Sequence, residues 1–341
     1  MSFPAACLIA LLLGAVCVLG FAPYGLWFVP IVALAGCFLL LLRFTTRRSR
    51  LGLAACFGFA YFFIGVGWLY ISLNHYGGVP ALFAVLAVGL FAAYLALFPL
   101  MAVYFASHMQ VSHVYWLLLV LPACYGLGEW LRGWLFSGFP WLAVGYAQIP
   151  GGWLAGYAPV LGIYGVSYLS LLSAGGLACL FAPGIAPRQR IAAVVLLTAV
   201  WGIGGALQQI SWTEAVGKPI SVALLQGNVP QDRKWQEEAL QETFAQVAEL
   251  ASMLAEHGLE LDHVVELTVD LEEVVDRLVK RAGAGGRTDD SEEVIRHRQE
   301  LFARETAPLV AAYAEQGLLT KVDGMGTVDE VSSRIFAALG I

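Results

Sequence analysis

The chain has 341 residues, of which 59% are hydrophobic and 13% are charged. This charged fraction is about half that of soluble domains, which excludes an ordinary soluble globular protein. Residues 1–210 carry seven Arg and one Glu, whereas residues 211–341 carry twelve Lys or Arg and twenty-four Asp or Glu. We therefore predict a membrane domain followed by an acidic soluble part, whose charge excludes nucleic-acid binding because it would repel phosphates.

Apolar runs of about 20 residues, the length of a membrane-spanning helix, recur along the first 210 residues. Seven spans are predicted, near 5–21, 26–43, 52–73, 80–107, 114–132, 158–182 and 191–209. The first run has no Lys or Arg before it, so we interpret it as a retained helix rather than a signal peptide. All six cysteines lie in these apolar runs without CxxC spacing, which favours a packing role. We predict no metal site and no cofactor.

Arginines predict the orientation of the spans. Arg43, Arg47, Arg48 and Arg50 share one loop, and Arg188 and Arg190 share another. Alternating spans place both loops on one side, which the positive-inside rule assigns to the cytoplasm. The N-terminus is then cytoplasmic, and everything after about residue 210 lies outside.

The segment 129–148, EWLRGWLFSGFPWLAVGYAQ, is unusual because Glu129 is the only acidic residue before position 210. Arg132 lies on the same helical face, three residues away, and aromatic side chains surround the pair. Intramembrane charge is costly and usually paired or functional. Two interpretations stay open: an ion pair at an interfacial helix end, or a substrate-facing pair. The lipid-facing candidates are Glu129, Arg132, Trp134, Phe139 and Trp141. Residues 136–157 are expected to form a re-entrant or interfacial loop.

The acidic part alternates between strand and helix patterns. A short apolar run at 220–225 suits a buried strand, and further strands are expected at 263–269 and 318–322. Helices are expected to about residue 257, near 271–282, near 291–316 and from Thr327, with Asp270 as an N-cap and Gly317 as a C-cap. This order predicts a small, incomplete α/β domain with a parallel sheet.

Four motifs together resemble bacterial apolipoprotein N-acyltransferase: GFAPYGLW at 20–27, GVGWLY at 65–70, the segment 129–148 and VALLQGNVPQDRKW at 222–235. The resemblance covers about residues 1–240. It implies a multi-pass domain in the bacterial inner membrane (1–212) and the first strand and loop of a periplasmic nitrilase-like domain (219–240). It also implies transfer of a phospholipid acyl chain, through a cysteine thioester, to a lipoprotein. Trp141 and Trp235 match tryptophans with an implied function.

The residues that the resemblance implies for catalysis are a glutamate, a lysine and a cysteine. No Trp-Pro-Glu sequence occurs, no cysteine follows Cys179, and the later lysines have unrelated contexts. The final membrane span of that family is also missing from this sequence. No catalytic residue is therefore assigned, and we expect an inactive acyltransferase scaffold that keeps phospholipid, and a lipoprotein substrate, as partners.

Residues 246–341 resemble the C-terminal part of an adenylate kinase with a short, zinc-free lid. That resemblance implies phosphate-binding roles for Arg277, Arg281, Arg287 and Arg298; alone, Arg277 and Arg281 would indicate a solvated helix face. No GxxxxGK phosphate loop occurs, so nucleotide binding is not expected. The chain is thus interpreted as a fusion joined near 240–246, with strand 220–225 lying beside strand 263–269. Two alternatives to the inactive scaffold are a nucleotide phosphotransferase fragment and an inert chimera.

Overall fold

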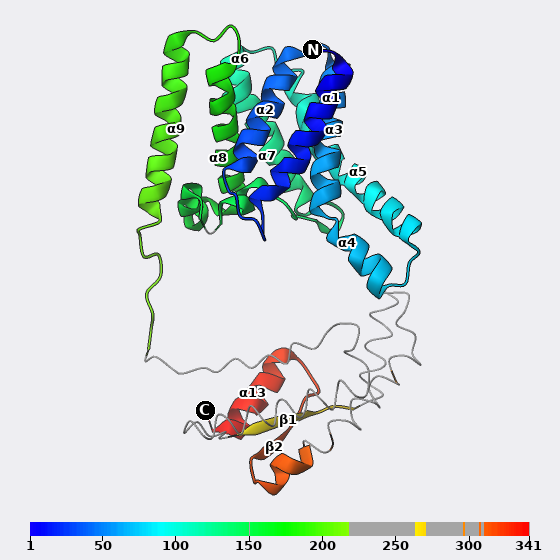
Figure 1. Ribbon diagram of the computed structural model, residues 1–341. Helices are drawn as coiled ribbons and strands as arrows, with labels where there is room; N and C mark the ends of the chain where they lie inside the picture. The colour runs from blue at the N-terminus through cyan, green and yellow to red at the C-terminus, as the bar shows by residue number, and fades with distance from the viewer. Residues whose placement is uncertain (150, 218–262, 271–295, 297–306, 308–309, 341) are drawn as a thin grey trace. The chain divides into compact units, whose positions relative to one another are not determined.

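The computed structural model describes residues 1–149, 151–217, 263–270, 296, 307 and 310–340 (Figure 1). The chain divides into two units, Met1–Gly217 and Lys218–Ile341, and each is described by itself.

Unit 1 is a helical bundle. Its long helices are α1 (Phe3–Cys17), α2 (Val29–Arg43), α3 (Arg47–Gly65), α5 (Ala81–Ala106), α7 (Leu121–Arg132), α8 (Ala158–Phe181) and α9 (Pro187–Leu207). Shorter helical turns are η1 (Val18–Gly20), α4 (Trp68–Ile71), η2 (Ser72–Tyr76), α6 (His113–Tyr115), η3 (Trp116–Val120), η4 (Leu135–Ser137), η5 (Val144–Gln148) and η6 (Trp153–Tyr157). All seven segments predicted to span a membrane are helical.

The number of helices that meet the length of a span is lower than predicted. In the described residues five helices are long and apolar enough, and a sixth counts if α3 and the α4–η2 segment, bent by 48°, form one span. The prediction of seven spans is corrected at α2, which has only 15 residues. Backbone hydrogen bonds within the hairpin before it, such as Leu26 N to Leu19 O at 3.0 Å, delay the start of α2.

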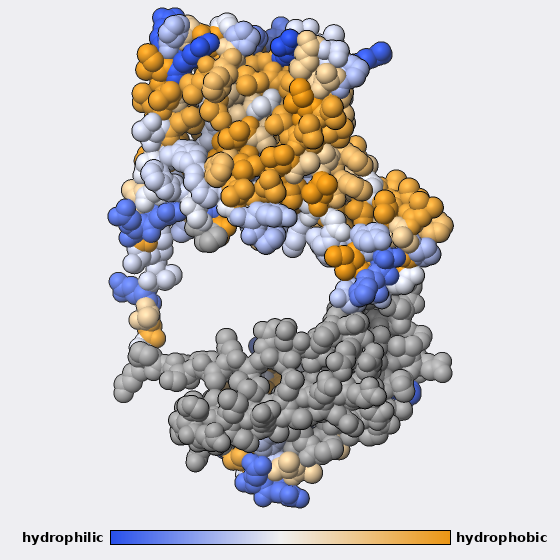
Figure 2. Space-filling view, viewed as in Figure 1, coloured by the Kyte–Doolittle hydropathy of each residue, from blue (hydrophilic) through white to orange (hydrophobic). Residues whose placement is uncertain are grey.

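The helices alternate in direction, which brings the predicted arginine loops together. The N-terminus, the α2–α3 connection and the α8–α9 connection lie at one end of the bundle, and the segment between α7 and α8 lies at the other (Figure 1). Both arginine loops therefore lie at one end of the bundle (Figure 1), as expected, and their assignment to the cytoplasm stays a prediction. Figure 2 shows hydrophobic residues covering the visible face of the bundle between these ends.

Helix α8 is the centre of the bundle, since 61% of its span is buried, whereas α9 is peripheral with 11% buried. Glycines allow the closest helix approaches, as is common between helices in membranes. A Cβ atom on Gly14 of α1 would lie 2.2 Å from the Phe57 carbonyl oxygen of α3, and one on Gly175 of α8 would lie 2.0 Å from Leu117 O. Only glycine fits these two positions without a shift of backbone.

In unit 2 the described strands are β1 (Val264–Thr268) and β2 (Leu319–Asp323), which pair in parallel. Both match the predicted strands at 263–269 and 318–322. Glu266 and Lys321 are partners in register, and their charged groups lie 3.0 Å apart. Gly317 has a φ of +72° after the helical residues 310–315, as its predicted C-cap role requires.

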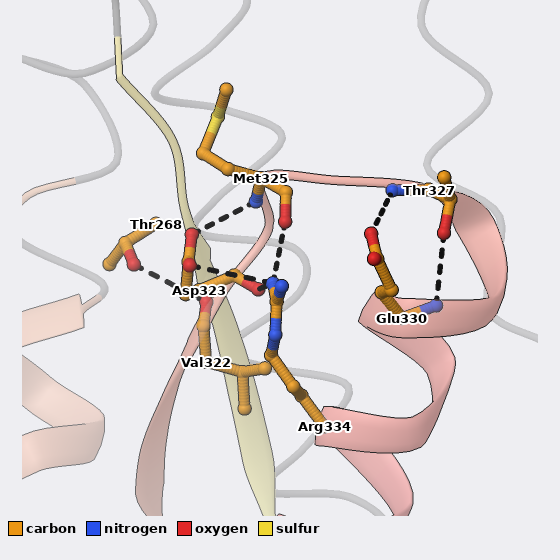
Figure 3. A network of polar contacts seen from close by, with 7 residues as sticks. All are labelled: Thr268, Val322, Asp323, Met325, Thr327, Glu330 and Arg334. Carbon is orange, nitrogen blue, oxygen red and sulfur yellow. Dashed lines mark hydrogen bonds and ion pairs between the residues drawn. The ribbon is translucent and has the colours of Figure 1, made fainter.

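Helix α13 (Val328–Leu339) follows β2 and begins one residue after the predicted start, Thr327. Thr327 caps it: the Glu330 N–H donates to Thr327 Oγ1, and the Thr327 N–H donates to Glu330 Oε2 (Figure 3). Hydrogen bonding from Thr327, above all from its backbone N–H, holds the pKa of the Glu330 carboxyl below its ordinary 4.5. Arg334 then donates to Asp323 O at 2.7 Å and to Met325 O at 2.6 Å, which ties α13 to the end of β2.

Several predictions for the acidic part lie outside the described residues. These are the strand at 220–225 with its proposed pairing, the helices to about residue 257 and near 271–282, most of the helix near 291–316, Trp235, and Arg277, Arg281, Arg287 and Arg298. They stay predictions.

Gly14→Ala tests the close contact between α1 and α3. We expect it to destabilise the bundle by about 1–3 kcal/mol, because overpacking forces the Phe57 backbone to move. The midpoint of thermal loss of helical circular dichroism in detergent is the measurement. Gly202→Ala in α9 is the control, since nothing lies within 4 Å of its added Cβ. Equal midpoints for both variants would contradict the packing.

Candidate functional site beneath an irregular loop

Helix α7 carries both unusual charges of unit 1 in its last two turns. Glu129 is 3% exposed and Arg132 is 2% exposed, so both side chains are buried. The helix ends immediately afterwards at Gly133, whose N–H donates to Glu129 O at 3.1 Å. The chain then enters the irregular segment 133–157, called loop 133–157 below.

In its described residues, 133–149 and 151–157, loop 133–157 contains only short helical turns, as expected of a re-entrant or interfacial segment. It includes three non-glycine residues with positive φ, Phe136 at 51°, Ser137 at 71° and Leu142 at 60°. Such conformations are uncommon for bulky side chains and persist only where surrounding contacts fix them. The contacts that fix the middle of the loop come from beneath it.

Arg132 binds the loop through backbone carbonyls. Its Nη1 donates to Phe139 O at 2.7 Å and to Trp141 O at 2.5 Å. The Phe139 N–H donates in turn to Arg132 O at 2.8 Å. The guanidinium carbon lies 5.0 Å from the centre of the Phe62 ring on α3, a cation–π contact. One arginine therefore holds both ends of the short stretch 139–141.

Three further hydrogen bonds continue along the loop. The Tyr61 hydroxyl of α3 donates to Leu142 O at 2.7 Å. Glu129 Oε1 accepts the Val144 N–H at 3.0 Å, and Ser167 Oγ of α8 accepts the Gly145 N–H at 2.8 Å. Backbone groups at this depth must be satisfied by protein, because lipid offers no partner. The bonds from α3, α7 and α8 satisfy them.

Glu129 and Arg132 do not form the direct ion pair considered above. Within the described part of the chain, no charged atoms of the two approach within 4 Å. Glu129 Oε2 and Arg132 Nη2 are both buried without a hydrogen-bond partner. Both side chains bind backbone groups of the loop instead, and one polar atom of each has no hydrogen-bond partner. That either residue faces a substrate stays a prediction.

Trp141 and Phe139 of the loop lie beside aromatic rings of neighbouring helices. Trp141 is 49% exposed, and its ring centre is 5.6 Å from that of Trp68 on α4. The Phe139 ring meets Phe91 of α5 edge-on at 4.9 Å and lies 6.4 Å from Trp141. These four residues, Trp68, Phe91, Phe139 and Trp141, are called the aromatic surface below. Arg132 binds the backbone of two of them.

The structure brings together four of the five predicted site residues that it describes: Glu129, Arg132, Phe139 and Trp141. Trp134 is exposed, and the ring contact it makes is with Trp130, at 5.3 Å. Sequence reasoning missed Tyr61 and Ser167, although both are polar groups within apolar segments. It also missed Gln148, which is fully buried and whose Nε2 donates to Trp27 O at 3.0 Å in the hairpin before α2.

Arg132→Ala and Glu129→Ala test this support. We expect each to speed amide hydrogen exchange across residues 139–145 by roughly ten- to a hundredfold, because a buried backbone group loses its partner at about 1–3 kcal/mol. Peptide-resolved exchange in lipid nanodiscs is the measurement. Leu127→Ala, an exposed position on the same helix, is the control. If amide protection across residues 139–145 were unchanged in both variants, the Arg132 and Glu129 hydrogen bonds would not be what stabilises the loop.

Comparison with known proteins shows that this site lies in a segment similar to a known family domain. Residues 13–176 match the family model described as the apolipoprotein N-acyltransferase N-terminal domain. The apolipoprotein N-acyltransferase of Nitrosomonas europaea is 47% identical over 248 residues, which are 71% of this chain and 48% of the relative. That of Chromobacterium violaceum is 44% identical over 237 residues, 70% of this chain and 45% of the relative.

The chain spans about half the length of the curated relatives it matches. The matches give no support to the adenylate-kinase resemblance of residues 246–341, which stays a prediction. Glu129, Arg132 and the aromatic surface all lie within the matched region. Residues 13–176 are therefore similar to the N-terminal domain of apolipoprotein N-acyltransferases.

Proposed function

We propose that unit 1 binds membrane phospholipid at the aromatic surface, with an acyl chain against the rings of Trp68, Phe139 and Trp141. The observation that carries this proposal is that buried Arg132 fixes the Phe139 and Trp141 backbone, while the exposed Trp141 ring lies beside the exposed Trp68 and the half-buried Phe139. Aromatic rings at the edge of a hydrocarbon layer offer a large apolar face and a polar edge, which suits the boundary between acyl chain and headgroup.

The relatives are named apolipoprotein N-acyltransferases, and this supports a phospholipid and a lipoprotein as partners. Glu129, Arg132 and Tyr61 serve as positioning residues in this proposal, since their bonds go to the loop backbone. The bacterial inner membrane is the proposed location. The arginine loops mark the cytoplasmic end, so the aromatic surface lies toward the opposite leaflet and residues after about 212 continue outside.

We further propose that the chain, as this sequence stands, does not transfer an acyl group. The resemblance implies that transfer proceeds through a cysteine thioester, and no cysteine follows Cys179. The six cysteines lie in unit 1 at buried or half-buried positions. The retained activity is then lipid binding alone.

A photoactivatable phosphatidylethanolamine, with a diazirine on its acyl chain, tests the binding site in reconstituted vesicles. We expect crosslinks to concentrate on peptides carrying Trp68 and Phe139, and Trp141→Ala to reduce them by about threefold or more, since an aromatic contact contributes roughly 0.5–1.5 kcal/mol. Trp153→Ala is the matched control, because Trp153 is equally exposed in the same loop. Crosslinks spread evenly over the exposed faces of α5 and α9 would contradict the proposal.

Catalytic inactivity is tested separately, so that the two claims can fail independently. We expect the chain not to rescue a strain depleted of its apolipoprotein N-acyltransferase, and the purified protein to form no hydroxylamine-labile acyl adduct with phospholipid. A full-length relative that contains the implied cysteine is the positive control for both assays. An adduct, or rescue of growth, would show that acyl chemistry survives in this chain.

A further inference from the structure

The end of unit 1 that is remote from loop 133–157 carries four exposed arginines, Arg43, Arg47, Arg48 and Arg188, called the arginine end below. Arg43 is the last residue of α2, Arg47 and Arg48 are the first two of α3, and Arg188 is the second of α9. These helix termini lie at the same end of the bundle (Figure 1). In Figure 2 strongly hydrophilic residues gather there, directly beside the hydrophobic face.

Two other arginines fix the backbone at this end. Arg50 Nε donates to Leu41 O at 3.0 Å and to Phe44 O at 2.9 Å, and its guanidinium carbon lies 5.2 Å from the Trp116 ring centre. Arg190 Nη2 donates to Ala182 O at 3.1 Å. These bonds hold the connections α2–α3 and α8–α9 in place. The four exposed arginines therefore project from an ordered frame.

No ion pair neutralises the arginine end within the described residues. The nearest recorded contact of an exposed guanidinium is that of Arg47, which lies 5.7 Å from the Tyr104 ring centre. Glu129, the only acidic residue before position 210, is buried beneath loop 133–157 at the other end. In addition, Arg47, Arg48 and Arg188 lie in the first turns of long helices, where the helix dipole favours anions over cations.

From this charge we infer that the arginine end binds the headgroups of anionic phospholipids. The occupant must be negative, because four cations and two helix N-termini meet there without a counter-charge. It must also lie at the boundary of the apolar face, which is the depth of phosphate groups in a bilayer. Arginine forks match phosphate oxygens, and basic residues close to an anionic leaflet attract its lipids. This inference is independent of the proposed acyl-chain site.

The test uses the full chain in phosphatidylcholine vesicles, with trace spin-labelled phosphatidylglycerol or phosphatidylcholine. Electron paramagnetic resonance measures the fraction of each label immobilised at the protein. We expect a larger immobilised fraction for phosphatidylglycerol than for phosphatidylcholine. This preference should weaken between about 0.05 and 0.5 M KCl, because the Debye screening length becomes shorter. The triple variant Arg43→Gln, Arg47→Gln, Arg48→Gln should lower it by about fivefold or more, since the loss of even one charge that binds an anionic headgroup, about 1 kcal/mol, corresponds to about fivefold.

The matched variant replaces the same three arginines by lysine and keeps the charge. It should retain most of the preference, which separates charge from a general loss of structure, and circular dichroism confirms that both variants stay helical. Equal immobilisation of the two lipids by the unmodified chain would overturn the inference. The inference would also be overturned if the glutamine variant kept its full preference for phosphatidylglycerol, or if the lysine variant lost as much of that preference as the glutamine variant.

Discussion

Loop 133–157 depends on one guanidinium group, that of Arg132, which is buried at the end of α7 and donates hydrogen bonds to the carbonyls of Phe139 and Trp141. Burying an arginine in a bundle this apolar is costly, and leaving loop carbonyls unpaired at the same depth is also costly. The hydrogen bonds between the Arg132 guanidinium and the loop carbonyls reduce both costs. Glu129 of the same helix accepts a hydrogen bond from the Val144 N–H. Helix α7 therefore supplies partners for both carbonyl and N–H groups of the loop.

This support explains why an irregular loop can present a defined surface. Arg132, Tyr61 and Ser167 reach the loop from three helices, so its backbone is fixed by contacts distant in sequence. The left-handed conformation of Leu142 is held where Tyr61 binds its carbonyl. Unit 1 thereby has two different charged ends. One end buries its charged groups under loop 133–157, and the other leaves four arginines exposed.

Local patterns predicted much of this arrangement. The apolar runs located every long helix of the bundle, and strands β1 and β2 followed from short β-branched runs ending near Gly or Asp. Glu129 and Arg132 were recognised because charge is rare in such runs and their spacing places them on one face. The length of α2 and the bend after α3 were not predicted, because hairpin bonds and helix packing determine them. The sequence also could not show that Glu129 and Arg132 form no ion pair. Both side chains bind the loop backbone instead, and the position of that backbone depends on tertiary contacts such as Tyr61 to Leu142.

The central claim is that Arg132 faces loop carbonyls rather than lipid phosphate, and solid-state NMR in bilayers measures this directly. Side-chain ¹⁵N of Arg132 would be recoupled in turn to carbonyl ¹³C of Phe139 and Trp141 and to phospholipid ³¹P. The account predicts strong dephasing by both carbonyls and none by phosphorus. Dephasing of the Arg132 nitrogens by ³¹P, with weak coupling to the two carbonyls, would contradict it.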